Sequence, residues 1–315
     1  MREGIKTLLN DIRSILQNLN NAKNWSLQVL QIKPSKRAGT EYTGREITFD
    51  PAGRLEEFVS EVSELYIGAK GCFDAKFVNL SEYDGSANGK TIYKLNGTSP
   101  LIASEYNSLM QALANPNFEV DPFEMKARAS VLIGQFERDE TIIPIKLISM
   151  QNPITMLKHR FMQNKGAFQE LDKKVLTLRP TIDVLIYGNE VYLFTLNGEN
   201  LFNMERSYKV LCSDYIAKVQ ESEIVVNIEK FSSVAGSGHN PRRFVSYNQS
   251  HLEKLKNAST RRKIATKFSI PMDGGKFDTN QEGVTEKIVK ILCGKGMVDP
   301  FESLPMEVPS AKKWE

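Results

Sequence analysis

The chain has 315 residues, a mass of 35.6 kDa and a formal net charge of +3 at pH 7. Hydrophobic residues make up 41% and charged residues 25%, a composition that is usual for a globular protein and excludes an intrinsically disordered chain. The charge is uneven, because segment 240–270 holds eight basic residues and one acidic residue. This concentration of positive charge on a mildly acidic remainder is typical of a protein that binds a polyanion.

Cysteine usage and hydropathy predict a protein of the reducing cytoplasm. Cys72, Cys212 and Cys293 lie far apart and are odd in number, so we expect structural thiols and no disulfide framework. The amino terminus lacks the apolar core of a signal peptide. No apolar run approaches the ~20 residues that a membrane-spanning helix needs, so we expect no direct membrane insertion.

The first 120 residues predict an α+β region, which is a candidate for a role in assembly. Apolar residues recur at helical spacing over 5–19, which predicts an amphipathic helix that packs on the core or on another subunit. A second helix is expected over 55–67, and a third begins at Ser99-Pro100 and ends near Asn115. Strands are expected over 25–33, 73–80 and 91–95, and a solvated loop over 34–53.

Residues 121–315 predict a second domain of mixed structure. The clearest signal is a hairpin over 182–196, whose arms flank the two-residue turn Gly188-Asn189. Strands are also expected over 129–136, 141–149 and 223–228, helices over 152–165, 204–219, 251–268 and 282–292, a flexible segment over 232–238, and little periodicity over 300–315. Strands and helices do not alternate regularly, so we predict an α+β fold with mixed, largely antiparallel sheets and packed helices.

The glycine-rich stretch 85–91 imitates a nucleotide-binding loop. That motif needs four residues between its first glycine and the Gly-Lys pair, but only three separate Gly85 from Gly89, and Asp84 occupies the required position. We expect a strand after it, so no helix N-terminus would face a phosphate. We therefore interpret 85–91 as a polar hairpin loop and exclude nucleotide hydrolysis.

A metal-dependent nuclease is the enzyme alternative. Such a site places an acid on one strand and an acid-x-lysine on its hairpin partner; Asp183 and Glu190 could supply the carboxylates, but Tyr192 replaces the lysine. No GxSxG elbow is present. Metal-ligand spacing is missing around all three histidines, His159, His239 and His251. We expect a binding protein without catalytic residues, metal or cofactor, and keep the nuclease as an alternative.

The candidate binding residues all lie in the basic segment. Arginine forks onto phosphate, and aromatic rings stack on exposed bases. The candidate DNA-binding residues are Arg242, Arg243, Phe244, Tyr247, Lys254, Lys256, Arg261, Arg262, Lys263 and Lys267. No short base-reading helix is evident, so we expect contacts with the phosphate backbone and weak sequence selectivity. Ordinary surface charge on a solvated helix, or docking onto an acidic protein or anionic lipid, are the alternatives.

The order of motifs in the last two-thirds of the chain resembles a known family. The segment LRPTIDVLIYGNEVY at 178–192 is followed by a helix from Asn200, and then by the stretches 260–263 and 283–297. This order is similar to that of the KwaB component of the bacterial Kiwa anti-phage system. The resemblance implies an oligomeric cytoplasmic protein that binds DNA, interferes with incoming phage DNA and works at the inner membrane with a membrane-spanning partner, KwaA. It transfers no catalytic residue.

Overall fold

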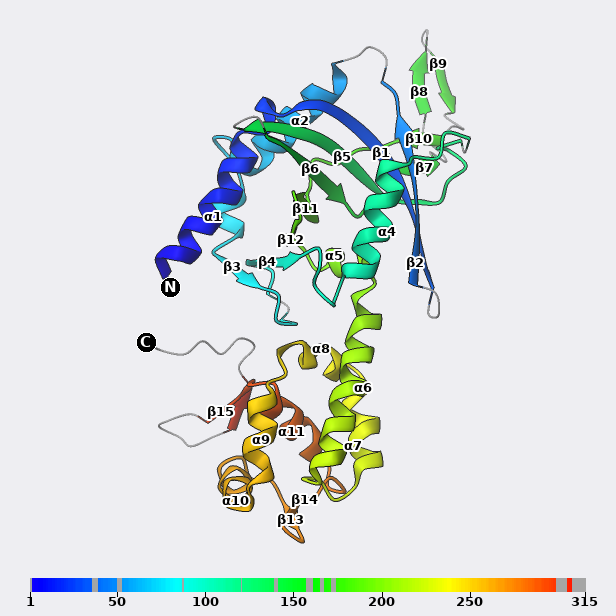
Figure 1. Cartoon of the computed structure of the whole chain (residues 1–315). Helices are drawn as coiled ribbons and strands as arrows, with labels where there is room; N and C mark the ends of the chain where they lie inside the picture. The colour runs from blue at the N-terminus through cyan, green and yellow to red at the C-terminus, as the bar shows by residue number, and fades with distance from the viewer. Residues whose placement is uncertain are drawn as a thin grey trace. The chain divides into compact units, whose positions relative to one another are not determined.

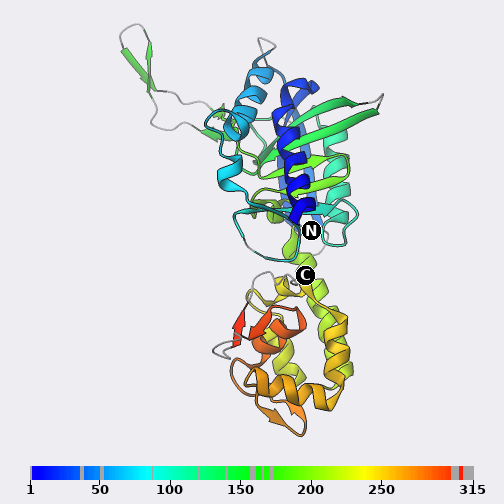
Figure 2. The same cartoon turned by 90° about the vertical axis from the view of Figure 1, so that its left-hand side faces the viewer.

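The computed structural model describes residues 2–35, 39–49, 53–86, 88–119, 121–138, 141–156, 161–164, 167–170, 174–298 and 305–307. The chain divides into two compact units. The first, termed the sheet unit, contains Met1–Glu82 and Gly89–Asn203; the second, termed the helical unit, contains Tyr83–Asn88 and Met204–Glu315. Figures 1 and 2 show the sheet and the helices of each unit. Among the described residues, no helix has the length and apolar character needed to cross a bilayer.

The sheet unit is built on an eight-stranded sheet with the order β2-β1-β5-β6-β11-β12-β4-β3. Its strands are β1 (Lys23–Ser35), β2 (Gly39–Ile47), β3 (Asn79–Glu82), β4 (Thr91–Asn96), β5 (Ala127–Arg138), β6 (Thr141–Ser149), β11 (Val184–Tyr187) and β12 (Glu190–Leu193). Neighbouring strands are antiparallel except for β3 and β4, which are parallel. This mixed, largely antiparallel sheet with packed helices confirms the predicted α+β class.

Helices cover both faces of this sheet (Figure 2). They are α1 (Arg2–Gln17), η1 (Leu19–Asn21), α2 (Arg54–Ile67), α3 (Phe73–Lys76), α4 (Ala103–Ala114) and α5 (Asn197–Leu201). Ile12 of α1 and Val59 of α2 are buried in one core with Leu27 of β1. Successive strand residues point to opposite faces, so the neighbouring Gln28 points the other way and its amide donates to the Leu113 carbonyl of α4 at 3.0 Å. The predicted amphipathic helix therefore packs on the core.

The helical unit surrounds a separate core. Its elements are α6 (Met204–Ser222), α7 (Ile228–Ala235), α8 (Asn240–Arg243), η2 (Phe244–Ser246), α9 (Gln249–Lys256), α10 (Ala258–Lys267), α11 (Val284–Leu292) and the short strands β13 (Met272–Asp273), β14 (Lys276–Phe277), β15 (Gly296–Val298) and β16 (Pro305–Glu307). Phe231, Phe244 and Phe277 are fully buried and pack with Ile288 and Leu292 of α11. Four further short strands belong to the sheet unit and form two small two-stranded sheets, β7 (Ile154–Met156) with β10 (Lys174–Leu176) and β8 (Phe161–Asn164) with β9 (Ala167–Glu170).

Several predicted elements match the structure closely. The hairpin over 182–196 is β11 and β12, and Gly188 in its turn adopts φ +59°, a conformation that glycine reaches without steric cost. The strand pair predicted over 129–136 and 141–149 is β5 and β6, and the helices predicted over 55–67, 204–219 and 282–292 are α2, α6 and α11. The segment 223–228 forms only an isolated bridge, between Val225 and Phe277.

Other predicted elements were wrong. The expected loop over 34–53 contains β2, which pairs with β1 from Leu27↔Ile47 to Ser35↔Gly39. The strand expected over 73–80 begins as helix α3, where Phe73 and Phe77, four residues apart, bring their ring centroids to 5.6 Å. The expected helix over 152–165 contains strands β7 and β8, and the flexible segment over 232–238 begins inside α7. The loop over 85–91 links the parallel strands β3 and β4, so it is not a hairpin loop.

The two units also divide the chain differently from the boundary expected at residue 120. Strands β1 to β4 come from the first 120 residues and the other four strands of the main sheet come from residues 127–193, but all eight hydrogen-bond into one sheet. A sheet cannot be cut between paired strands without exposing their backbone groups. The larger division therefore falls at Asn203, just before α6.

A candidate polyanion-binding surface on the helical unit

The basic segment folds as two helices, although one continuous helix was predicted over 251–268. Asn257 interrupts the helix with φ −75° and ψ 121°, and its side-chain oxygen accepts a hydrogen bond from the backbone N–H of Thr260 at 3.1 Å. Asparagine favours this N-cap position because its side chain satisfies an otherwise unpaired donor of the first turn. The break separates α9 from α10 and turns the direction in which their cations project.

Buried apolar residues decide which faces of α9 and α10 are exposed. Leu252 and Leu255 of α9 and Ala265 of α10 pack into the core of the helical unit. The remaining faces carry exposed cations, which we term the basic helix pair: Lys254, Lys256, Arg262, Lys263 and Lys267. Lys263 and Lys267 are four residues apart on α10, so they lie on one face about 6 Å apart along the helix axis.

These five cations differ in whether they have a partner inside the protein. Lys256 forms an exposed ion pair with Glu253 at 2.9 Å, an interaction that contributes little in water and exchanges readily. Among the described residues, Lys254, Arg262, Lys263 and Lys267 have neither an ion pair nor a side-chain hydrogen bond. Their charges are therefore available for an external anion.

Arg261, the neighbour of Arg262, holds the local structure together. Its guanidinium donates to the carbonyl oxygens of Gly275 at 2.7 Å, Leu255 at 2.7 Å and Lys256 at 3.2 Å. Carbonyl groups at the end of a helix lack intrahelical partners, so a cation there satisfies them and complements the helix dipole. Arg261 thus binds the last turn of α9 and the turn between β13 and β14. Because its guanidinium group is used in these hydrogen bonds, we do not count it among the cations that can bind DNA.

Arg242 and Arg243 are also engaged within the helical unit. Arg242 donates to the Tyr83 hydroxyl at 3.2 Å and to the Ser86 carbonyl at 3.1 Å. Arg243 donates to the side-chain oxygen of Asn240 at 2.6 Å. Both side chains are half-buried, unlike the cations of the basic helix pair. The structure therefore does not bring these two arginines into the surface that α9 and α10 present.

The two aromatic candidates lie inside a stack of rings. Phe244 is fully buried, so the predicted stacking on an exposed base does not fit its position. Tyr247 is half-buried, with its ring centroid 3.9 Å from that of Tyr215, and Lys218 lies 5.0 Å from the Tyr215 centroid. Burial, with a smaller contribution from Tyr215, raises the pKa of Tyr247 to about 12. Phe244 is thus enclosed, and one face of the Tyr247 ring is covered by Tyr215.

The carboxylate of Asp183 organises backbone and does not face solvent. It is 5% exposed and accepts hydrogen bonds from the Met150 backbone N–H at 2.7 Å, from the side-chain amide of Asn197 at 3.1 Å and from the Thr195 hydroxyl. These donors lie at the end of β6 and in the segment that leads into α5. The motif 178–192 is thus a structural motif in the sheet unit.

Glu190, the second carboxylate of the nuclease alternative, lies at the opposite end of the same hairpin. It pairs across the ladder with Tyr187, four residues beyond Asp183, which places the two acids ~13 Å apart along the strand. Its side chain forms an ion pair with Lys94 and accepts a hydrogen bond from Tyr192. A metal ion cannot be held by two carboxylates at this separation, so the structure does not bring this pair together as a site.

The cysteines of the helical unit are enclosed. Cys212 and Cys293 are buried, and burial raises the pKa of the Cys212 thiol to about 11 and that of Cys293 to about 12. A thiol with a raised pKa holds its proton at neutral pH and is a poor nucleophile. Within the described ranges, no cluster of three or more histidine, cysteine, aspartate or glutamate side chains could hold a metal ion.

The fold and the surface define an α+β protein whose candidate site is a cationic pair of helices. A family model described as Kiwa protein KwaB-like matches residues 127–295, which is more than half of the chain and runs from β5 through α9, α10 and α11 to Lys295. The chain therefore belongs to the KwaB-like family, a component of Kiwa anti-phage defence. No curated protein and no solved structure matches it.

Proposed function

We propose that this protein is a DNA-binding effector of anti-phage defence that holds phage DNA by its phosphate backbone. The observation that supports the proposal most is the exposure of Lys254, Arg262, Lys263 and Lys267 on neighbouring helices without an internal partner. Duplex DNA carries one negative charge for every ~1.7 Å of its axis, so closely spaced cations can each meet a separate phosphate. Such contacts carry no sequence information, which predicts weak selectivity.

The helix pair also supports phosphate contact over base reading. Its exposed cations are mainly lysines, which bind phosphate as point charges, and Arg262 is the single arginine of the basic helix pair. Base reading in the major groove favours arginine, asparagine and glutamine in a bidentate arrangement. We therefore revise the predicted ten-residue site to the basic helix pair, and leave out Arg242, Arg243, Phe244, Tyr247 and Arg261.

A mobility-shift assay on the purified chain tests the proposal. Duplex DNA is titrated with protein at several salt concentrations, with and without magnesium or manganese, and the integrity of the DNA is read afterwards. We expect intact DNA whose retention falls with salt. Well-folded protein that retains no DNA at low salt would contradict the proposal, and cleaved DNA in the presence of metal would replace it with the nuclease. A protein partner captured equally before and after nuclease treatment, without DNA retention, would favour an acidic protein as the ligand.

We further propose that the protein works in the cytoplasm as a homo-oligomer, at the inner membrane through a membrane-spanning partner that resembles KwaA. Membership of the KwaB-like family supports this setting. Cell fractionation with and without the partner tests it: we expect the chain to move from the supernatant to the membrane fraction when the partner is present. An identical distribution in both strains would count against the partner. Sedimentation of the purified chain would reveal the oligomer.

A further inference from the structure

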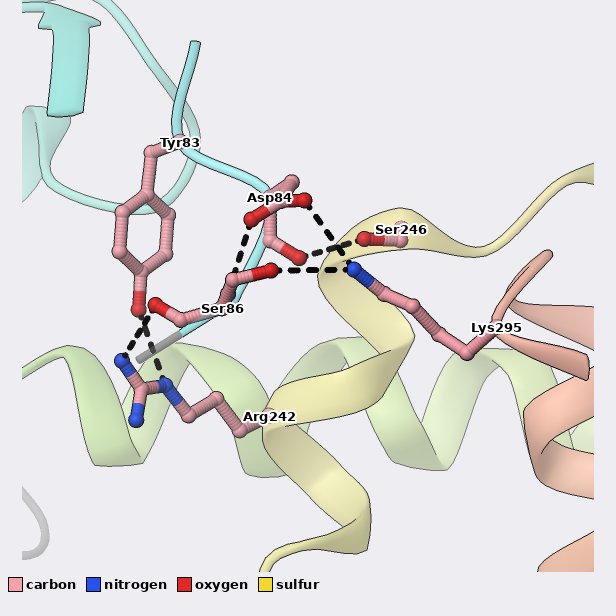
Figure 3. A network of polar contacts seen from close by, with 6 residues as sticks. All are labelled: Tyr83, Asp84, Ser86, Arg242, Ser246 and Lys295. Atoms are coloured by element: carbon pink, nitrogen blue, oxygen red, sulfur yellow. Dashed lines mark hydrogen bonds and ion pairs between the residues drawn. The ribbon is translucent and has the colours of Figure 1, made fainter. Parts of the chain in front are cut away.

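The loop between β3 and β4 belongs to the helical unit although both strands belong to the sheet unit. The sheet unit ends at Glu82 and resumes at Gly89, and Tyr83–Asn88 between them is part of the helical unit. Figure 3 shows the side chains that hold this loop, which come from α8, η2 and the segment just after α11. Tyr83, Asp84 and Ser86 contact side chains of Tyr208, Arg242, Ser246 and Lys295, all of which belong to the helical unit.

The first anchor of the loop is Tyr83. Its ring stacks nearly parallel to that of Tyr208 on α6, at 8° and a centroid distance of 6.5 Å, and the two hydroxyls form a hydrogen bond. Arg242 of α8 donates to the same Tyr83 hydroxyl at 3.2 Å and to the Ser86 carbonyl at 3.1 Å. Tyr83 is 8% exposed, so a large aromatic group and its polar end are both satisfied inside the helical unit.

The second anchor is an ion pair between the buried Lys295 and the partly exposed Asp84. The ammonium group of Lys295 lies 3.1 Å from the Asp84 carboxylate and 3.2 Å from the Ser86 hydroxyl (Figure 3). The Lys295 side chain is only 8% exposed, and a buried cation is costly unless a partner compensates it. Asp84 also accepts a hydrogen bond from the Ser86 backbone N–H at 2.8 Å, and the Ser246 hydroxyl donates to the Asp84 carbonyl. Burial of the Lys295 ammonium group is therefore compensated by Asp84 and Ser86 of the loop.

The loop also requires glycine at its centre. Gly85 adopts φ +76°, a left-handed conformation that other residues rarely reach. A Cβ atom at this position would lie 2.4 Å from the carbonyl oxygen of Arg242, which is backbone and cannot move aside cheaply. The helical unit therefore holds the sequence Tyr-Asp-Gly-Ser by three kinds of contact. Its backbone passes close to Gly85, its cations Arg242 and Lys295 bind polar groups of the loop, and Tyr208 stacks on Tyr83.

The same part of the helical unit holds the start of the basic segment. Asn248, the N-cap of α9, donates its backbone N–H to the Leu292 carbonyl at 3.1 Å, and a His251 ring nitrogen lies 3.1 Å from the Ile291 carbonyl. Leu292 ends α11, and Lys295 follows three residues later. The turn that delivers Lys295 to the loop therefore also fixes the N-terminal end of α9.

We propose that the helical unit carries a recognition site for Tyr83–Ser86 and uses it as a latch on β3 and β4. The chain enters the loop directly from β3, which is four residues long and ends its sheet, and leaves it for β4. Short edge strands open most easily, because they have a partner on one side only. Capture of the loop restrains both strand ends, so release of the loop loosens β3 and β4.

Hydrogen exchange on the full-length chain tests the latch. The variants Asp84→Asn and Lys295→Met each remove one partner of the ion pair between Lys295 and Asp84. Lys276→Met is the matched control, because it breaks an exposed ion pair of the same unit, Lys276 with Glu223 at 3.4 Å. We expect the first two variants to speed the exchange of amides in the loop, β3 and β4 by roughly tenfold or more, because removal of one partner leaves the other uncompensated. We expect β5 and α6 to remain as in the parent chain.

Two results would overturn the latch. In one, loop amides exchange faster while those of β3 and β4 do not change; in the other, the control variant loosens β3 and β4 as much as Asp84→Asn does. If the two variants fail to fold, hydrogen exchange of the unmodified chain at a series of denaturant concentrations tests the latch. The Ser86 amide and the amides of β3 are then expected to open in one common step, and opening of the loop well before the strand would contradict the proposal. Neither measurement depends on DNA binding.

Discussion

Arg261 donates its guanidinium Nε–H to the carbonyl oxygen of Gly275 at 2.7 Å, and so links α10 to the turn between β13 and β14. The next residue, Arg262, is exposed. Two adjacent arginines of one basic run therefore have different roles, because one points toward unpaired carbonyl groups and the other points toward solvent.

Arg261→Ala is expected to destabilise the protein, whereas Arg262→Ala is expected to leave its stability nearly unchanged. The first substitution leaves the carbonyls of Leu255 and Gly275 without their charged donor, at a cost of about 2 kcal/mol. The second changes the free energy of unfolding by no more than about 0.5 kcal/mol, as is usual for exposed positions. Urea unfolding of both variants measures the difference. Equal stability of the two variants would contradict the structural role of Arg261.

Asp183→Ala is expected to lower the stability of the sheet unit and not to abolish a metal-dependent reaction. The substitution removes a buried carboxylate that accepts hydrogen bonds from the Met150 backbone N–H and from the side-chain amide of Asn197. The expected loss is about 3 kcal/mol, since a charged acceptor is involved. Thermal or urea unfolding gives the result. A variant that keeps its full stability but loses metal-dependent DNA cleavage would restore the nuclease alternative.

The ion pair of Glu190 predicts a specific dependence of stability on pH. Burial raises the pKa of Glu190, but the hydrogen bonds from Lys94 and Tyr192 outweigh burial and hold the pKa below its usual value of 4.5. A carboxyl whose pKa is lowered by folding stabilises the protein above the unfolded pKa and loses this contribution as the pH falls through the folded pKa. Glu190→Gln should therefore be less stable than the parent chain at neutral pH.

The difference between Glu190→Gln and the parent chain should shrink as the pH falls below about 4.5, where the parent carboxylate also becomes protonated. Urea unfolding at pH 7 and at a series of acidic pH values measures this trend. A difference that stays constant over the whole range would show that the substitution acts through shape and not through charge.

Periodicity and turn chemistry predicted much of the fold. The β11–β12 hairpin follows from Gly188-Asn189 between two β-rich arms, and α1 follows from apolar spacing alone. Strand β2 was missed because its charged residues suggested a solvated loop, although it pairs with the strand just before it in the chain, β1. β2 lies at the edge of the sheet, where charged residues such as Glu41 and Arg45 are usual and resemble those of a loop.

The candidate site was predicted in position but not in detail. Charge counting located the basic segment, yet it could not separate Arg261, whose partners are carbonyl groups, from Arg262 and Lys263, which face solvent. The side-chain partners of Arg242 lie more than 150 residues away in the sequence, so no local pattern reveals them. One signal was available: Asn257 interrupts the helical pattern at a favoured N-cap residue.

The most direct test of DNA binding compares the salt dependence of two fourfold variants with that of the parent chain. One variant replaces Lys254, Arg262, Lys263 and Lys267 by alanine; the control replaces four exposed cations of the sheet unit, Lys33, Lys70, Lys126 and Arg128. Four phosphate contacts contribute a slope of about −3.6 to log K against log salt. The first variant should lose about this much of the slope, and the control should keep the parent slope. An equal loss of binding in both variants, or none in either, would contradict the account.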